Sequence, residues 1–144
     1  QNDTSYAFPV TFGYTFTDTE FLNSFGSDDG LWGEVQSGDE LPYIAKHQFN
    51  TSISLEHAKF ELNLSGRLNG AFKTEASADA VNSTNGITSN FIIDFAGKYH
   101  VSKTLSITAK MINLLDETYA VAKVPAGLRP GHPFGIYGGL DFRF

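Results

Sequence analysis

The sequence contains no cysteine and carries little positive charge, and both absences narrow what the chain can do. Without cysteine there can be no disulfide, no thiolate zinc site and no cysteine nucleophile. With 10 Lys and Arg against 16 Asp and Glu the formal charge is −6, so nucleic acid is not an expected partner. No apolar run approaches the roughly 18 residues of a transmembrane helix. The 144 residues predict one domain or part of one, and the start at Gln1 rather than Met suggests a processed chain or a fragment.

Helical periodicity is nearly absent as well, and alternation with a period of two residues takes its place. One phase of each alternating stretch is apolar. Of the 13 Phe, all except Phe21 and Phe25 fall on this phase, and no Asp, Glu, Lys or Arg does. The other phase is rich in Ser, Thr, Asn and Gly. The pattern predicts an all-β chain with strands at about residues 6–16, 47–55, 59–72, 90–101, 103–113 and 134–144.

The connections between these strands alternate in length. Two are short, and three are long, at roughly residues 17–46, 73–89 and 114–133. Short turns at one end and long loops at the other are typical of an antiparallel up-and-down transmembrane β-barrel, whose strands need about 9–11 residues to cross a bilayer. A soluble β-sandwich also alternates, but its strands are usually nearer 5–6 residues and its loops shorter. Closed barrels need about eight strands or more, so six strands must associate with others. The chain is then the end of a longer one, or several short chains build a homo-oligomeric pore.

Two motifs lie near the long connections. The run Ile112 to Tyr119 reads I-N-L-L-D-E-T-Y, Arg129-Pro130-Gly131 follows, and the chain ends at Phe144. This resembles the C-terminus of TonB-dependent outer-membrane receptors, which have an N-L-x-D-x-x-Y segment, an R-P-G turn and a last strand ending in Phe. Residues 38–48, G-D-E-L-P-Y-I-A-K-H-Q, are similar to the G-x-x-L-P-x-x-P-x-H-Q segment of that family. Two residues depart from the family pattern. Ala45 stands where proline is common, and His132, after the R-P-G turn, stands where a small residue is common. Receptors of the ferric-dicitrate and siderophore type are the nearest match.

The resemblance implies a location in the bacterial outer membrane and a role in importing a scarce ligand, either a ferric siderophore or ferric citrate. Members of this family have a barrel of about 22 strands with an N-terminal plug. The chain would supply the last six strands, and the plug and its TonB box would lie outside it. The implied partners are the remaining strands and plug, outer-membrane lipid, the TonB complex through the plug, and the ferric chelate. No cofactor and no catalytic step are implied. In this family the alternating Leu140, Phe142 and Phe144 resemble the signal for barrel insertion.

Four residues are candidates for lining a ligand vestibule among the loops: Trp32, Tyr119, Arg129 and His132. Trp32 could stack on a ligand or pack within its own loop against Phe25. The guanidinium of Arg129 suits an anionic chelate, but it could also bond carbonyls of the R-P-G turn. No histidine has metal-ligand spacing, and no serine lies in a G-x-S-x-G elbow, so neither a metal site nor an enzyme is expected.

The first long connection is strongly acidic, with Lys46 as its only strong base. This acidity could capture cations at a cell surface, or it could simply keep the loop solvated; the spacing is not that of an EF-hand. Its acidic residues are Asp18, Glu20, Asp28, Asp29, Glu34, Asp39 and Glu40.

Overall fold

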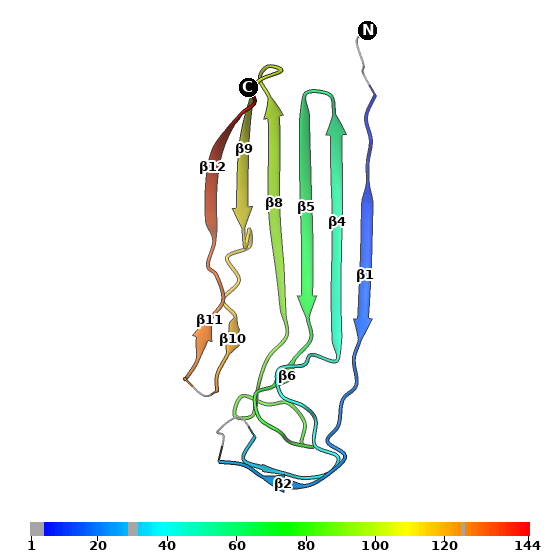
Figure 1. Cartoon of the computed structure of the whole chain (residues 1–144), viewed down its shortest axis with the longest axis vertical. Helices are drawn as coiled ribbons and strands as arrows, with labels where there is room; N and C mark the ends of the chain where they lie inside the picture. The colour runs from blue at the N-terminus through cyan, green and yellow to red at the C-terminus, as the bar shows by residue number, and fades with distance from the viewer. Residues whose placement is uncertain (1–4, 29–31, 125) are drawn as a thin grey trace.

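The long strands form a single six-stranded sheet in which each strand pairs antiparallel with its neighbours (Figure 1). The computed structural model describes residues 5–28, 32–124 and 126–144. The order across the sheet is the order along the chain, so the chain runs up and down, and in the described part β1 and β12 are edges that do not meet each other. The strands are β1 (Val10–Phe16), β4 (His47–His57), β5 (Phe60–Asn69), β8 (Asn90–His100), β9 (Leu105–Ile112) and β12 (Gly135–Phe142).

The register aligns the apolar phase of every strand on one face of the sheet. One row across all six strands consists of Val10, Ile53, Leu64, Phe95, Met111 and Ile136. In the described chain this face is uncovered, with Val10 67%, Ile53 53% and Ile136 62% exposed. An apolar surface that spans a whole sheet must be covered by a partner or by lipid. The described residues contain no second large sheet stacked on it, which is at odds with a self-contained sandwich.

The opposite face carries the polar phase. A row there consists of Thr11, Ser52, Ser65 and Asp94. A hollow of about 480 Å³ lies on this face and is lined by Asn63, Ala96 and Lys110 among others, which indicates that the sheet curves toward its polar side.

The connections separate to the two ends of the sheet (Figure 1). At the turn end, Ala58 and Lys59 join β4 to β5, and residues 101–104 join β8 to β9. The Ser102 hydroxyl accepts the amides of Thr104 and Leu105 at 3.2 and 3.1 Å and so fixes the second turn. At the loop end lie three long segments, loop A (residues 17–46), loop B (residues 70–89) and loop C (residues 113–134).

Each of these loops contains a short ribbon of two strands. Loop A holds β2 (Phe25–Gly26) and β3 (Glu34–Val35), loop B holds β6 (Phe72–Lys73) and β7 (Gly86–Ile87), and loop C holds β10 (Ala120–Ala122) and β11 (Arg129–Pro130). The alternation of apolar and polar residues does not predict these ribbons, because two or three residues are too few to show it.

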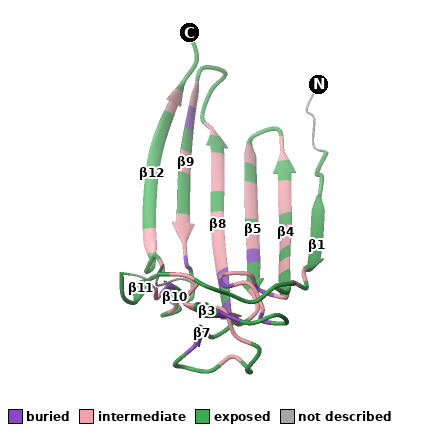
Figure 2. Ribbon diagram, turned by 60° about the horizontal axis from the view of Figure 1, so that its bottom comes forward, coloured by how far each residue is buried: buried purple, intermediate pink, exposed green. Residues whose placement is uncertain are grey.

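Most of the buried residues lie at the loop end rather than along the sheet (Figure 2). Val35, Ala45, Ile87 and Ala122 belong to the loops, and Ile92 alone of the buried apolar residues lies on the sheet. The loops therefore form a small core of their own, whereas the sheet relies on whatever covers its apolar face. The described residues contain no helix long and apolar enough to cross a membrane.

Two strand boundaries differ from the sequence prediction by more than two residues. β1 begins at Val10 instead of about residue 6 because Pro9 has no amide to continue the ladder, although Ala7 forms an isolated bridge to Glu56 beyond it. The strand predicted at residues 59–72 ends at Asn69, and Phe72 pairs with Ile87 in the loop B ribbon.

The uncovered apolar face predicts a strong asymmetry between two arginine substitutions on β8. Phe95→Arg should prevent membrane assembly of the intact protein, because an arginine at mid-bilayer costs about 2–4 kcal/mol. Ala96→Arg, the adjacent residue on the polar face, should assemble normally. Heat-modifiable mobility in outer-membrane fractions measures both, and equal assembly of the two variants would show that the faces are wrongly assigned.

Candidate ligand-binding site

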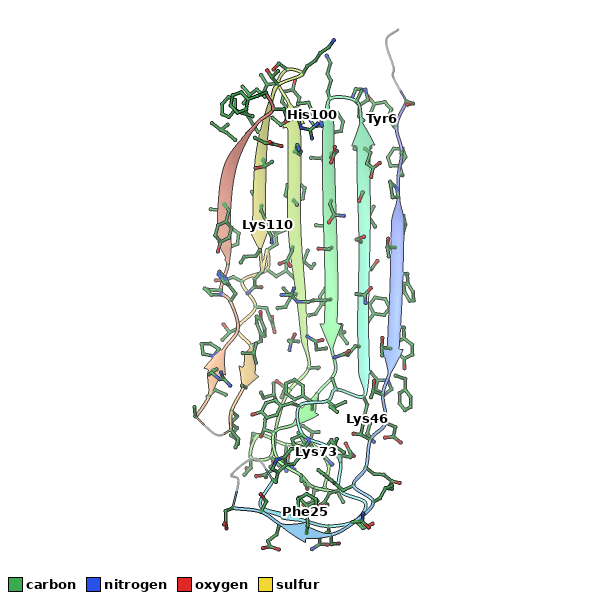
Figure 3. The ribbon with its side chains drawn as sticks, viewed as in Figure 1. Tyr6, Phe25, Lys46, Lys73, His100 and Lys110 are labelled. Carbon is green, nitrogen blue, oxygen red and sulfur yellow. The ribbon has the colours of Figure 1, made fainter. Side chains whose placement is uncertain are left out.

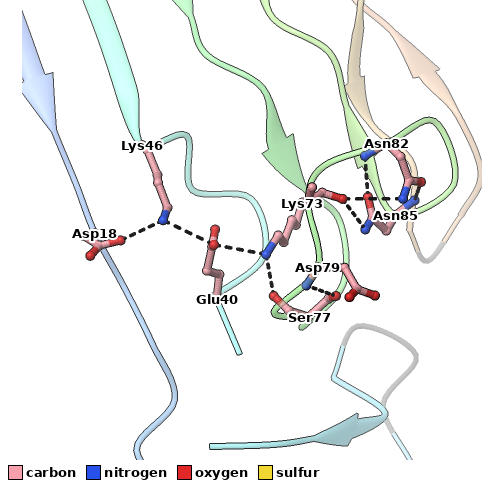
Figure 4. A network of polar contacts seen from close by, with 9 residues as sticks. Asp18, Glu40, Lys46, Lys73, Ser77, Asp79, Asn82 and Asn85 are labelled. Atoms are coloured by element: carbon pink, nitrogen blue, oxygen red, sulfur yellow. Dashed lines mark hydrogen bonds and ion pairs between the residues drawn. The ribbon is translucent and has the colours of Figure 1, made fainter. Parts of the chain in front are cut away.

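Ion pairs around a buried lysine join loop A to loop B (Figure 4). Lys73, which is 3% exposed, places its ammonium 3.1 Å from Glu40 of loop A and donates to the Ser77 carbonyl at 2.6 Å. Glu40 also meets Lys46 at 3.3 Å, and Lys46 meets Asp18 at 3.0 Å. A buried ammonium persists only when it is paired, so this chain of contacts fixes loop A against loop B.

The Tyr43 hydroxyl joins loop A to loop C. It donates to the Val124 carbonyl at 2.6 Å and accepts the amides of Lys123 and Val124 at 3.2 and 2.9 Å. Tyr43 has a φ of 62°, which is uncommon for a residue other than glycine, and its own amide donates to the Lys73 carbonyl at 2.7 Å. From loop C the Lys123 ammonium reaches the carbonyls of Ser83 and Thr84 in loop B at 2.8 and 2.5 Å. The three loops are thus connected pairwise.

The residues of the I-N-L-L-D-E-T-Y motif stabilise the base of loop C. Asn113 is 1% exposed; its side-chain amide donates to the carbonyls of Glu117 and His132, both at 2.9 Å, and its side-chain oxygen accepts the Glu117 amide at 2.9 Å. Asp116 accepts the amide of Phe134 at 2.9 Å. The motif is therefore a set of caps and bridges that holds both ends of the loop together.

The R-P-G turn contacts the same motif. The Gly131 amide donates to the Tyr119 carbonyl at 2.7 Å, and the Tyr119 ring lies so close over Gly131 that a Cβ at this position would overlap it. Only glycine allows this approach, which is the physical reason for the third letter of the turn.

The polar face of the sheet carries a few charge pairs. Arg67 meets Asp94 at 3.3 Å and Lys98 meets Asp141 at 3.0 Å. His100 lies 3.3 Å from Glu61 near the turn end, and Figure 3 shows it at the opposite end of the sheet from Lys46 and Lys73. In the described part of the chain no group of three or more His, Cys, Asp or Glu side chains is arranged to hold a metal ion.

The four vestibule candidates lie in the loops but do not form one cluster. The Trp32 ring packs edge-on against Phe21, with ring centroids 5.5 Å apart, and Phe21 packs in turn on Phe25. The His132 ring bonds to the Tyr137 hydroxyl at 3.1 Å. Arg129 is exposed on β11, and its guanidinium makes no bond to any described residue.

Of the four candidates, Tyr119 lines a pocket among the described residues. This pocket, of about 210 Å³, lies where the loops meet the sheet, and Tyr43, Gln48, Asn69 and Asn90 also line it. No motif or alternation in the sequence marks these last four residues as site residues. The only signal was that Tyr43 and Gln48 lie in the quoted segment of residues 38–48.

The residues that resemble an insertion signal lie on β12 and just after it. Leu140 and Phe142 are exposed on β12, on the apolar face, and Phe144 follows the strand at the turn end. Of the acidic residues of loop A, Asp18 and Glu40 bind Lys46, and Asp29 lies outside the described residues.

An open, curved sheet with one apolar face, turns at one end and ordered loops at the other is a segment of an up-and-down β-barrel. No protein-family model matches the chain, and neither does a curated protein sequence. Among solved structures, the closed form of the ferric-catecholate import receptor Fiu of Escherichia coli K12 superimposes with a TM-score of 0.74 and 22% identity, over 96% of this chain and 19% of that receptor.

Two further structures are similar. The open form of Fiu gives a TM-score of 0.62 at 21% identity, covering 77% of this chain and 18% of the receptor. The ferric enterobactin receptor PfeA of Pseudomonas aeruginosa gives 0.57 at 21% identity, covering 74% and 17%. The chain therefore spans about a fifth of the length of the receptors it matches. These likenesses confirm, at the level of the fold, the predicted antiparallel barrel segment and its resemblance to TonB-dependent receptors.

The hydrogen bonds of the Tyr43 hydroxyl predict that removing this one oxygen atom weakens the contact between loop A and loop C. Tyr43→Phe removes the acceptor of the Lys123 and Val124 amides, a loss of about 1–3 kcal/mol, so both amides should exchange with deuterium roughly ten- to a hundredfold faster. Tyr119→Phe is the matched control, because the Tyr119 hydroxyl has no partner among the described residues. Unchanged exchange in Tyr43→Phe would show that Tyr43 does not join the loops.

The Lys46 contacts predict a pKa change of known sign. Hydrogen bonds to Asp18 and then to Glu40 raise the pKa of Lys46 above its ordinary value of 10.5. The stabilisation is therefore fully present below pH 10.5 and is lost as pH rises through the higher folded-state pKa. Asp18→Asn should lower the Lys46 pKa, measured from the ¹³Cε NMR shift, whereas Asp28→Asn in the same loop should leave it unchanged. An Asp18→Asn variant with an unaltered Lys46 pKa would contradict the pairing.

Proposed function

We propose that this chain is part of the barrel wall of an outer-membrane, TonB-dependent receptor that imports a ferric siderophore. The observation that carries the proposal is the structural match of 96% of the chain to 19% of a ferric-catecholate import receptor. In this arrangement the apolar face contacts lipid, and the polar face lines the interior around a plug. Loops A, B and C lie at the extracellular surface, and the TonB complex acts through the plug. The chain contributes no catalytic step.

The location of the ligand contacts follows from charge. Ferric catecholates are anionic, and in loop C the Arg129 guanidinium is exposed and has no bonding partner among the described residues. Planar guanidinium groups suit anionic oxygen donors. Arg129 is therefore the first of the four vestibule candidates to test, while the packing of Trp32 on Phe21 and the bond from His132 to Tyr137 favour structural roles.

Uptake of radiolabelled iron tests the function. A strain lacking the gene should lose uptake of one ferric chelate, and ferric enterobactin and ferric citrate are the two to compare. Restoring the gene with Arg129→Ala should weaken uptake affinity about tenfold, the loss of one charge-assisted contact, whereas Arg143→Ala at the turn end should restore it fully. Full uptake of every ferric chelate by the deletion strain would reject the proposal.

The two unpaired sheet edges are also compatible with one alternative function, a pore assembled from several copies of a short chain. Intact mass of the denatured outer-membrane protein separates them. A polypeptide several times heavier than 15.7 kDa that contains this sequence supports the receptor. A single 15.7 kDa species in a detergent-stable oligomer supports the pore.

A further inference from the structure

A small uncharged pocket opens where loops A, B and C meet the sheet. Its volume is about 210 Å³. It is lined by Tyr43, Ala45, Gln48, Asn69, Phe72, Asn90, Tyr119, Ala120 and Val121. None of these side chains carries a charge, although the ion pairs of Lys46 and Lys73 lie in the same loops.

Three amide side chains form one side of the pocket. Gln48, Asn69 and Asn90 are register partners across β4, β5 and β8, so they lie in one row at the loop end of the polar face. The Asn69 amide nitrogen donates to the Asn90 side-chain oxygen at 3.4 Å. The Gln48 amide makes no bond to any described residue.

Asn90 is the informative member of this row. It is only 6% exposed, and its amide nitrogen has no partner among the described residues. Within that part of the chain no fully enclosed side-chain nitrogen or oxygen lacks a bond, so the unbonded Asn90 nitrogen keeps some accessible surface, and Asn90 is one of the residues that line the pocket. An accessible amide donor on the wall of a pocket is available to bond to water or to a ligand that enters the pocket.

Aromatic rings form the other sides. The rings of Tyr43 and Phe72 pack at a centroid distance of 5.9 Å, and the hydroxyl bonds of Tyr43 to loop C hold this pair in place. The Tyr119 ring is held against Gly131. The pocket therefore combines fixed aromatic surface with amide groups that both donate and accept.

We propose that this pocket binds a single neutral, hydroxyl-bearing ring of the sugar type. Hydroxyls donate and accept as amides do, and the C–H faces of a sugar ring suit aromatic surface. An anionic ferric centre would have no countercharge among the lining residues. The volume is below the roughly 300–1,000 Å³ of pockets that take a whole drug-sized ligand, so one ring enters and not an entire chelate. As a subsite of the imported ligand, the assignment rests on the proposed function.

Saturation-transfer difference NMR on the intact protein in nanodiscs tests the pocket directly. The probe is methyl β-D-glucopyranoside, with 2-methoxytetrahydropyran as the same oxygen-containing ring without hydroxyl groups. The wild type should bind the glucoside and not the control ring. Gln48→Ala and Asn90→Ala should each weaken glucoside binding about tenfold. Gln36→Ala is the matched control, an exposed glutamine of loop A outside the pocket, and it should bind as the wild type does.

The outcomes also separate this assignment from the transport function. Uptake of iron from ferric enterobactin, with and without a glucosyl group on one ring, distinguishes a sugar carried by the ligand from a free sugar. Preference for the glucosylated complex, lost in Gln48→Ala, supports the first source, and glucoside binding without this preference supports the second. Intact iron uptake with no glucoside binding, or binding that survives both Gln48→Ala and Asn90→Ala, overturns the pocket assignment alone. Glucoside binding with no iron uptake overturns the transport function alone.

Discussion

The whole structure depends on one constraint, which is that a sheet with an uncovered apolar face must pair every backbone amide and carbonyl within itself. In hydrocarbon there is no water to satisfy a free group. Long antiparallel ladders with aligned register meet this demand within the sheet. At the edges β1 and β12, closure on further strands would meet it in the proposed barrel. The same alignment gives one apolar face and one polar face, so the position of every polar side chain follows from the ladder.

The loop end is stabilised in a different way from the sheet. Its stability comes from a small core around Val35, Ile87 and Ala122 and from polar bridges between loops, as a soluble domain's would. Lys73, Tyr43 and Lys123 each connect two loops, so the three loops present a fixed surface. A fixed surface lets a pocket keep accessible amide donors such as that of Asn90, because the loops do not collapse onto it.

Prediction from the sequence was most reliable where a regular alternation of side chains continued over many residues. Alternation over ten residues predicted the strands and their faces, and the motif around Asn113 indicated the barrel type. It was least reliable at Pro9 and Phe72, where a missing amide and a short loop ribbon shifted the strand ends. Trp32, Arg129 and His132 stay predictions as vestibule residues; in the structure Trp32 packs on Phe21 and His132 bonds to Tyr137. Side chains on loops have no periodicity, so nothing local predicts which of them meet.

The sequence by itself determined the faces of the sheet, because alternation of side chains is a property of each strand alone. It also determined which end carries the turns, through the lengths of the connections. Only the tertiary structure decided that Gln48, Asn69 and Asn90 share one row. It also decided that Tyr119, whose ring packs on Gly131, lines the same pocket. These residues are separated by tens of positions in the chain. Register between strands and packing between loops bring them together, and both are set by contacts that no single segment contains.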